Sequence, residues 1–360
     1  MKIFDPQKKV LCNIDKVYDF FVNGNTFPVL VEIDPSNICN HNCSFCLSKH
    51  INRKKDRKVL PESMLVNVCK ELKNNSVRAV TFTGGGEPTV NEYLSEAINE
   101  LECVDVGLFT NGSLLHHNNF ISNSIHNIKW IRICIDAACR ETYLKIHGVD
   151  HWGQVWDNIH SLFLRSECFT LGVGFIITPD NYNEIIKFAE LVSQLPVDYC
   201  QYKPEIKTIE DTHGIQHSNK FWNDDVVPKL VEAKKILKEK FQINLYKLND
   251  LLYGEGREYQ LCLGSQLQPC IGADGLVYIC PNFRGYPEYS YGSLYDKCFV
   301  DIWNDIDIRR KLIKKIDNEN FCNCTPLCKP HESNKMMWEL WCDYKNALSK
   351  RRDIMHWRFI

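Results

Sequence analysis

The chain lacks any hydrophobic run long enough to cross a membrane, and its first residues, 1–6, lack the apolar core of a signal peptide. It also lacks an excess of charge of one sign, since 43 basic residues nearly balance 45 acidic ones. That balance gives no electrostatic basis for binding nucleic acid, and the short basic run 52–58 is typical of a solvated loop. We therefore expect a cytoplasmic protein that binds neither membrane nor nucleic acid.

Cysteine, by contrast, is abundant, with 18 in 360 residues. Disulfides are disfavoured in the cytosol, so grouped cysteines indicate bound metal. A Cys-x3-Cys-x2-Cys motif follows the β-branched run 29–33 and consists of Cys39, Cys43 and Cys46. Iron–sulfur cubanes normally use four thiolates, so three leave one iron open to a cofactor or substrate. The alternatives are a zinc site that recruits His41 or His50, and buried cysteines without metal.

A glycine-rich turn follows the next strand-like run and reads Gly84-Gly85-Gly86-Glu87-Pro88. Glycines let the backbone approach a ligand closely, and the Glu87 carboxylate can accept a hydrogen bond from a ligand ammonium. A glycine run alone is usually only a turn. Next to a cysteine motif on the neighbouring strand, it indicates a binding site for the ligand of the open iron.

Together, these two motifs resemble those of the radical S-adenosylmethionine (SAM) superfamily. The resemblance implies a [4Fe–4S] cluster on the three cysteines, with SAM bound to its open iron. It implies a 5′-deoxyadenosyl radical that abstracts hydrogen from a substrate carbon, and a flavodoxin- or ferredoxin-type electron donor. The cofactor contacts that it implies are Phe45, Gly85, Gly86, Glu87, Asn111 and Cys134. Relatives often carry Ser where Cys134 stands and Arg where His147 stands.

The rest of the first 240 residues alternates between two kinds of segment. Strand-like runs lie near 29–34, 79–83, 104–110, 130–136, 171–178 and 197–203. Helix-like stretches lie near 62–74, 91–101, 117–127, 152–166, 181–194 and 224–241. This alternation predicts an α/β fold with a parallel sheet, and the resemblance implies an open (β/α)6 partial barrel with its active site at the carboxyl ends of the strands. In the last strand, either Gln201 and Lys203 or Cys200 and Tyr202 face the interior.

Cysteines return after residue 258, around a hairpin turn at 272–275 that can present both of its arms to one metal. This part resembles the auxiliary-cluster extension called SPASM in its full form and twitch in its shorter form. The resemblance implies one auxiliary [4Fe–4S] cluster, with the ligands Cys262, Cys280, Cys324 and Cys328. A second cluster that uses Cys270, Cys322 or Cys342 fits the pattern less well. Zinc on the same four cysteines is the alternative.

We expect five parts in the chain. They are an N-terminal extension (1–28), the barrel (29–205), a helical connection (206–258), the SPASM/twitch domain (259–335) and an amphipathic C-terminal helix (336–360).

The leading functional hypothesis is a radical SAM oxidoreductase, of the dehydrogenase or epimerase type, that acts on a small polar, carbohydrate-like substrate. Oxidation needs a base and an electron acceptor, whereas epimerisation needs a hydrogen donor such as a thiol; Cys200, Cys270 and Lys203 are the candidates. The alternative is a maturase of a ribosomally made peptide or protein, although 38 residues before Cys39 are too few for a peptide-recognition domain. A non-enzymatic redox-sensing metalloprotein is a third reading.

Overall fold

The computed structural model describes residues 6–52, 57–117, 120–163, 169–206, 217–242, 257–318, 324 and 328–351. Within this part, one ten-stranded sheet has the order β10-β9-β8-β1-β2-β3-β4-β5-β6-β7. Its strands are β1 (Leu30–Ile33), β2 (Ala79–Phe82), β3 (Asp105–Thr110), β4 (Ile128–Cys134), β5 (Thr170–Ile177), β6 (Tyr199–Pro204), β7 (Phe241–Gln242), β8 (Cys270–Ile271), β9 (Leu276–Tyr278) and β10 (Ser290–Ser293). The strands β1 to β6 match the six predicted runs to within two residues.

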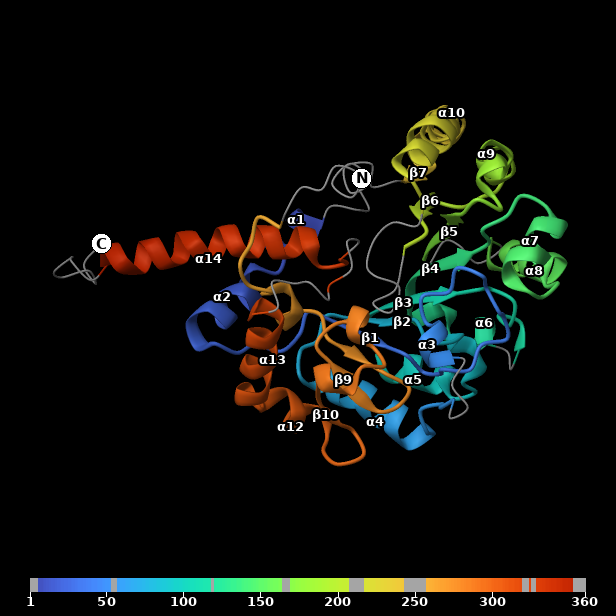
Figure 1. Ribbon diagram of the computed structural model, residues 1–360. Coiled ribbons are helices and arrows are strands. Elements are labelled where there is room, and N and C mark those ends of the chain that lie inside the picture. Colours follow the sequence, from blue (N-terminus) through green and yellow to red (C-terminus); the bar gives the residue numbers. More distant parts are fainter. Residues whose placement is uncertain are drawn as a thin grey trace.

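The described residues form thirteen α-helices, and most of those that connect the barrel strands lie along the outer side of the sheet (Figure 1). They are α1 (Pro6–Leu11), α2 (Ile14–Asn23), α3 (Lys49–Asn52), α4 (Glu62–Asn74), α5 (Leu94–Glu100), α6 (Phe120–Ser124), α7 (Arg140–His147), α8 (Trp152–Phe163), α9 (Ile185–Ser193), α10 (Val227–Leu237), α12 (Phe299–Asn304), α13 (Ile306–Asn318) and α14 (His331–Arg351). The sequence pattern did not predict α1, α2, α3 or α7. The expected helix at 224–241 begins as a π-helical turn at Phe221 and ends as α10 at Leu237.

Alternation along the strands separates an apolar outer face from a more polar inner face. Val80, Phe82, Ile131 and Ile133 are fully buried and belong to the main core beneath the helices. The residues between them point to the inner side of the curved sheet, because successive side chains in a strand face opposite ways. The fold is therefore an open, largely parallel partial barrel, as the sequence predicted.

The cysteine-rich C-terminal part extends this sheet. Strand β8 pairs in parallel with β1, with Glu32 opposite Cys270, and the hairpin β8–β9 is antiparallel. Its turn contains Gly275 at φ +78°, a backbone conformation that favours glycine. Sheet pairing thus places the predicted auxiliary-cluster segment beside the first strand of the barrel. Much of the expected connection lies outside the described residues, at 207–216 and 243–256.

The helices at the two ends of the chain pack together. α1 and α2 lie against α14, which extends away from the sheet (Figure 1). Val17 and Met337 are fully buried in this small core, and the Phe21 and Trp341 rings meet edge to face at 5.0 Å. α14 begins at His331, earlier than predicted, and residues 352–360 lie outside the described part. Among the described helices, none combines the length and apolarity needed to span a bilayer.

Candidate functional site

The three cysteines of the first motif converge at the carboxyl end of β1. Burial raises the pKa of the Cys43 thiol well above its usual value, and nearby Cys46, Asp136 and Cys39 raise it further. Burial raises the pKa of Cys39 to about 12, and the neighbouring Glu87 carboxylate adds to this effect. Thiols that perturb one another in this way lie close together. Because thiolate is the form that binds metal, a positively charged metal centre would relieve this unfavourable grouping.

The glycine turn lies directly on the cysteine loop. The Gly86 amide donates to the Ser36 carbonyl and the Glu87 amide to the Ile38 carbonyl, each at 2.9 Å. A Cβ atom on Gly86 would stand 2.2 Å from the Ile38 carbonyl oxygen, and one on Gly85 would stand 2.2 Å from the Asn37 side-chain oxygen. Side chains larger than hydrogen would therefore push the two loops apart. The glycines therefore allow the backbone of the turn to approach the cysteine loop closely, as the sequence predicted.

The Glu87 carboxylate is buried and ties three loops together. Its Oε1 accepts hydrogen bonds from the Thr89 amide at 3.1 Å and from the Thr89 and Thr110 hydroxyls at 2.6 Å each. Its Oε2 accepts from the Asn111 amide at 2.8 Å. Each carboxylate oxygen has about two lone pairs, so Oε1 is saturated and Oε2 can accept one more donor. Any contact of Glu87 with a ligand ammonium would therefore use Oε2.

Asn111 holds the neighbouring loop against the cysteine motif. Its side-chain amide donates to the Asn40 oxygen at 2.8 Å, and its own oxygen accepts from the Ser113 amide and hydroxyl at 2.9 and 2.7 Å. The next residue, Gly112, has φ +78°, which permits the sharp turn after β3. Asn111 also lowers the pKa of Cys39 by hydrogen bonding to its thiol, although burial and Glu87 act more strongly. This predicted cofactor residue therefore borders the three cysteines.

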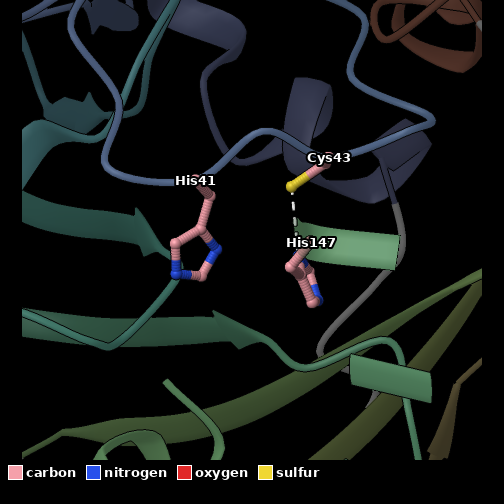
Figure 2. A group of neighbouring side chains, drawn as sticks. All are labelled: His41, Cys43 and His147. Atoms are coloured by element: carbon pink, nitrogen blue, oxygen red, sulfur yellow. Dashed lines mark hydrogen bonds between the residues drawn. The ribbon is translucent and has the colours of Figure 1, made fainter. Parts of the chain in front are cut away.

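Two histidines approach the middle cysteine of the motif. His147 Nδ1 lies 3.0 Å from Cys43 Sγ, and His147 Nε2 donates to the Ile135 carbonyl at 2.9 Å. Figure 2 shows His41 and His147 on the same side of the loop as the Cys43 sulfur, and their candidate ligand atoms lie within 4.8 Å of one another. Burial lowers the pKa of His41 to about 3 and that of His147 to about 4, so both rings are neutral.

If the first site bound zinc instead of a cluster, His41 and His147 would be the histidine ligands beside Cys43. His41 is part of the group, whereas His50 is not: its Nε2 donates to the Arg284 carbonyl at 3.0 Å, and its ring stacks on Tyr286. Phe45, the predicted adenine contact, packs edge to face on His147 with ring centres 5.9 Å apart. The position where relatives often carry Arg is thus a buried His that supports Cys43 and Phe45.

The sequence did not predict that Arg284 belongs to this site. Arg284, which follows Cys280 by four positions, contacts Asp34 through Nε at 2.6 Å and donates to the Gly84 carbonyl at 3.2 Å. Asp34 in turn accepts from the Gly85 amide at 3.1 Å. Burial raises the pKa of Asp34 to about 6, even though Arg284 and the Gly85 amide act to lower it. No motif marks Arg284, because its role depends on β8 pairing with β1.

The inner face of the barrel resolves the open question about β6. Tyr202 donates its hydroxyl to the Ile185 carbonyl of α9 at 2.9 Å and packs on Phe188, so it faces outward. Cys200 shares this outer face, is fully buried and interacts with the Tyr202 hydroxyl. Gln201 instead contacts the inward-facing Arg132. Cys200 is therefore excluded as a residue that meets substrate inside the barrel, since its strand position turns it toward the helices.

The other catalytic candidates lie on the inner side. Lys203 follows Gln201 by two positions on the same face, and its charge lowers the pKa of Cys134 and of Asp136. Burial raises the pKa of the Cys134 thiol to about 11. Cys270 Sγ accepts a hydrogen bond from Arg284 at 3.7 Å and is fully buried. Cys134 thus borders the first cysteine site, whereas Cys270 is covered by Arg284.

The four cysteines of the predicted auxiliary site also come together. Burial raises the pKa of the Cys280 thiol well above its usual value, and Cys324, Cys262 and Cys328 raise it further. Asn334 from α14 donates to Cys262 Sγ at 3.6 Å. Cys270 is not among the groups that act most strongly on Cys280 in the described part of the chain. Cys342 is half-buried on α14, and Cys322 lies outside the described residues.

An open parallel sheet that gathers three thiols, a glycine turn and a carboxylate at its carboxyl edge defines an α/β cofactor-dependent enzyme domain. Residues 33–192 match the radical SAM superfamily, and the chain contains a domain of this family. Such a domain implies a [4Fe–4S] cluster and SAM, and the convergent thiols, the glycine cradle and the open position on Glu87 fit both groups.

Similar proteins support the family and the fold. A probable GTP 3′,8-cyclase from Saccharolobus islandicus is 30% identical over 172 residues, which cover 47% of this chain and 54% of the relative. A second, from Saccharolobus solfataricus, is 29% identical over 177 residues. The chain thus spans about half the length of these curated relatives.

Among solved structures, Streptococcus suis SuiB bound to S-adenosylmethionine covers 85% of this chain and 73% of its own, at 16% identity and a TM-score of 0.62. The structure of anSMEcpe with bound AdoMet and a peptide covers 80% of this chain and 82% of its own, at 17% identity and a TM-score of 0.55. At these identities, the likeness concerns the fold.

Proposed function

We propose that the protein is a radical SAM oxidoreductase that removes hydrogen from a small polar substrate held inside the barrel. The observation that carries this proposal is the convergence of Cys39, Cys43 and Cys46 with the glycine turn and Glu87 at one edge of the sheet. When bound there, the cluster and SAM supply a 5′-deoxyadenosyl radical that abstracts hydrogen, with an external protein as the reductant.

Each residue at this edge has a specific task in the proposal. The three cysteines hold the cluster, and the backbone of Gly85 and Gly86 together with Glu87 Oε2 receives the ammonium of SAM. Phe45, Asn111 and Cys134 border the rest of the cofactor. His147 holds Cys43 and Phe45 in place through its contact at 3.0 Å and its ring packing.

The second group of cysteines supports oxidation as the outcome. Cys262, Cys280, Cys324 and Cys328 would hold an auxiliary cluster that accepts an electron from the substrate. Four thiols complete a cubane, so this site leaves no position for SAM. Oxidation removes two hydrogens from the substrate: one as an atom and one as a proton, with the remaining electron passing to the acceptor. Lys203, once in its neutral amine form, is the inward-facing candidate for the proton acceptor.

Epimerisation is the other outcome of the same chemistry, and it needs a hydrogen donor on the inner face. Cys200 faces α9, and Arg284 covers Cys270. Cys134 is the described cysteine of the inner face that borders the first site, so it is the donor that an epimerase would use. Product analysis distinguishes the two outcomes. Solvent deuterium in an otherwise unchanged isomer indicates epimerisation, and loss of two hydrogens indicates oxidation.

A peptide substrate is the second candidate. The observation that favours it is the fold of SuiB, which has also been solved bound to the precursor peptide SuiA and covers 84% of this chain in that form. A small substrate and a side chain of a peptide would meet the same inner residues. The two are separated by whether a low-molecular-weight product or a modified polypeptide forms.

The proposed activity is tested by anaerobic reconstitution with iron and sulfide, followed by measurement of 5′-deoxyadenosine under strong reductant. We expect the wild-type protein to cleave SAM and a variant with Ala at Cys39, Cys43 and Cys46 to lose cleavage. The matched control is Cys12→Ala, since Cys12 is exposed and remote from both cysteine groups in sequence. Zinc bound at His41, Cys43 and His147 in place of iron, or absence of 5′-deoxyadenosine, would overturn the proposal.

A further inference from the structure

We propose that the substrate carries an oxyanion, either a carboxylate or a phosphate, and that Arg132 binds it on the inner face of the barrel. This inference rests on the proposed function, because it assumes that the substrate lies inside the barrel next to the SAM site. It adds the chemical class of the group by which the substrate is recognised.

Arg132 is an inward-facing residue of β4, and its guanidinium contacts Phe109 and Gln201. Its central carbon lies 4.0 Å from the centre of the Phe109 ring, and one terminal nitrogen donates to the Gln201 side-chain oxygen. A guanidinium presents its N–H groups in a planar fork that matches carboxylate and phosphate, and it can pack on an aromatic ring at the same time. Its Nε is buried and has no hydrogen-bond partner within the described residues. One donor of the fork thus lacks an acceptor.

The charge around Arg132 also favours an anion. Within the described part of the chain, Arg132 makes no ion pair, whereas two other cations of this region, Arg284 and Lys329, have acidic partners. Lys329 pairs with Glu32 and lies 5.6 Å from the same Phe109 ring, and Arg284 pairs with Asp34. Arg132 therefore retains a positive charge that no described carboxylate offsets at contact distance. An oxyanion would supply both the missing charge and the missing hydrogen-bond acceptor.

The position of Arg132 suits a small substrate. Cys134 lies two residues further along the same face of β4, and two residues of a strand span roughly 6.6 Å. The charge of Arg132 lowers the pKa of Cys134, and Cys134 in turn acts on Cys43 of the first motif. A substrate whose anionic end binds Arg132 would therefore extend its carbon atoms toward the SAM site. Gly174 on β5 leaves room there, because a Cβ at this position would stand 3.7 Å from Arg132 Nε.

The experiment measures binding of two probes to the reconstituted, SAM-loaded protein by calorimetry: inorganic phosphate and glutarate. We expect the wild-type protein to bind at least one of them. Arg132→Gln should weaken this binding by about tenfold or more, because it loses charge-assisted hydrogen bonds. The probe affinity of Arg132→Lys should lie between those of the wild type and Arg132→Gln, since lysine keeps the charge and loses the fork of N–H donors. Preference for phosphate or for glutarate identifies the kind of oxyanion.

The matched control is Arg140→Gln, which removes a positive charge from an arginine that pairs with Asp150 and is 67% exposed. Its probe binding and SAM cleavage should equal those of the wild type. The proposal is overturned if Arg132→Gln, folded as judged by circular dichroism, binds the probes as tightly as wild type, or if the wild type binds neither at millimolar concentration. SAM cleavage by the same wild-type sample separates these outcomes from failure of the proposed function, which would abolish cleavage itself.

Discussion

Arg284 lies between the two groups of cysteines: it contacts the glycine turn, and its charge acts on Cys280. Its side chain is 13% exposed and contacts Asp34 and Gly84, both next to the SAM-binding edge. Its backbone carbonyl accepts a hydrogen bond from His50 of α3, and it follows Cys280 by four residues in the sequence. An arginine fork with a buried carboxylate and a backbone carbonyl orients both partners. We infer that Arg284 positions the glycine turn for SAM.

Replacement of Arg284 tests this positioning role. Arg284→Gln should weaken equilibrium binding of SAM to the reconstituted protein by about tenfold, because the Asp34 carboxylate and the Gly84 carbonyl lose their shared donor. The iron content should stay close to that of the wild type, since Arg284 is not a proposed ligand. Arg78→Gln, which removes an exposed arginine paired with Asp15, is the control and should bind SAM normally. Unchanged SAM affinity in Arg284→Gln would contradict the inference.

Asp34 gives a prediction for the pH dependence of stability. Burial raises its pKa from 3.8 to about 6 in the folded protein, so the folded state binds this proton more tightly than the unfolded state. The stabilisation from the protonated carboxyl is complete below pH 3.8 and is lost as the pH rises through about 6. Relative to Asp34→Asn, the wild type should lose up to about 3 kcal/mol of unfolding free energy across this interval.

Urea unfolding of the metal-free wild type and Asp34→Asn at several pH values measures this difference. Other titrating groups are common to both proteins and cancel in the comparison, apart from those coupled to Asp34. A difference that is flat between pH 4 and 6, or that grows in favour of the wild type, would show that Arg284 outweighs burial at this carboxyl.

At the scale of elements, the site depends on how closely two loops approach. The loop after β1 and the turn after β2 share backbone hydrogen bonds at Gly86 and Glu87. Gly86→Ala would place its Cβ 2.2 Å from the Ile38 carbonyl oxygen, and backbone atoms cannot rotate away as a side chain can. We expect a loss of about 1–3 kcal/mol in stability from this overpacking, together with impaired SAM binding.

Gly153 on α8 provides the matched control. A Cβ at Gly153 would meet no atom within 4 Å, and the residue is exposed. Gly153→Ala should leave SAM binding unchanged and should stabilise the helix by about 0.5–1 kcal/mol, because alanine loses less conformational freedom on folding. Thermal unfolding and SAM binding of both variants compare the two glycines. Equal behaviour of the two variants would refute the close-approach explanation.

At the scale of the whole molecule, strand pairing joins the barrel and the C-terminal cysteines into one sheet. The parallel pairing of β8 with β1 places the Cys280 segment, through Arg284, against the glycine turn. The thiols that act most strongly on Cys280 are Cys324, Cys262 and Cys328, whereas those that act most strongly on Cys43 are Cys46, Cys39 and Cys134. Removal of one proposed auxiliary ligand should therefore reduce metal binding at the auxiliary site more than at the Cys39, Cys43 and Cys46 site.

Cys280→Ser tests that separation. We expect reconstituted protein to fall from about eight irons per chain to about four, since each cubane holds four irons. 5′-Deoxyadenosine formation should continue at a reduced rate, and substrate oxidation should stop for lack of an electron acceptor. Cys298→Ser is the control, because Cys298 is exposed and belongs to neither group. Loss of all iron in Cys280→Ser would mean that the sites assemble together, and no loss would exclude Cys280 as a ligand.

Local patterns made much of this molecule predictable. Periodicity located β1 to β6, because buried parallel strands are short apolar runs bounded by turn residues. Spacing identified the cysteine motif and the glycine turn, since both act through contiguous backbone. By contrast, α1 and α2 were not predicted, although α2 has a clear amphipathic pattern. Only the tertiary structure shows that they pack against α14 at the other end of the chain.

The sequence alone determined the six strands of the barrel, the resemblance to the radical SAM superfamily and the residue types at the carboxyl edge, because these follow from local periodicity and from motifs of fewer than a dozen residues. Only the tertiary structure decided that Cys200 faces the helices and that His147 supports Cys43. It also decided that Arg284 contacts the glycine turn and that Arg132 lies over Phe109. The register of paired strands determines which of two alternating faces is inside, and contacts between segments more than a hundred residues apart leave no local pattern in the chain.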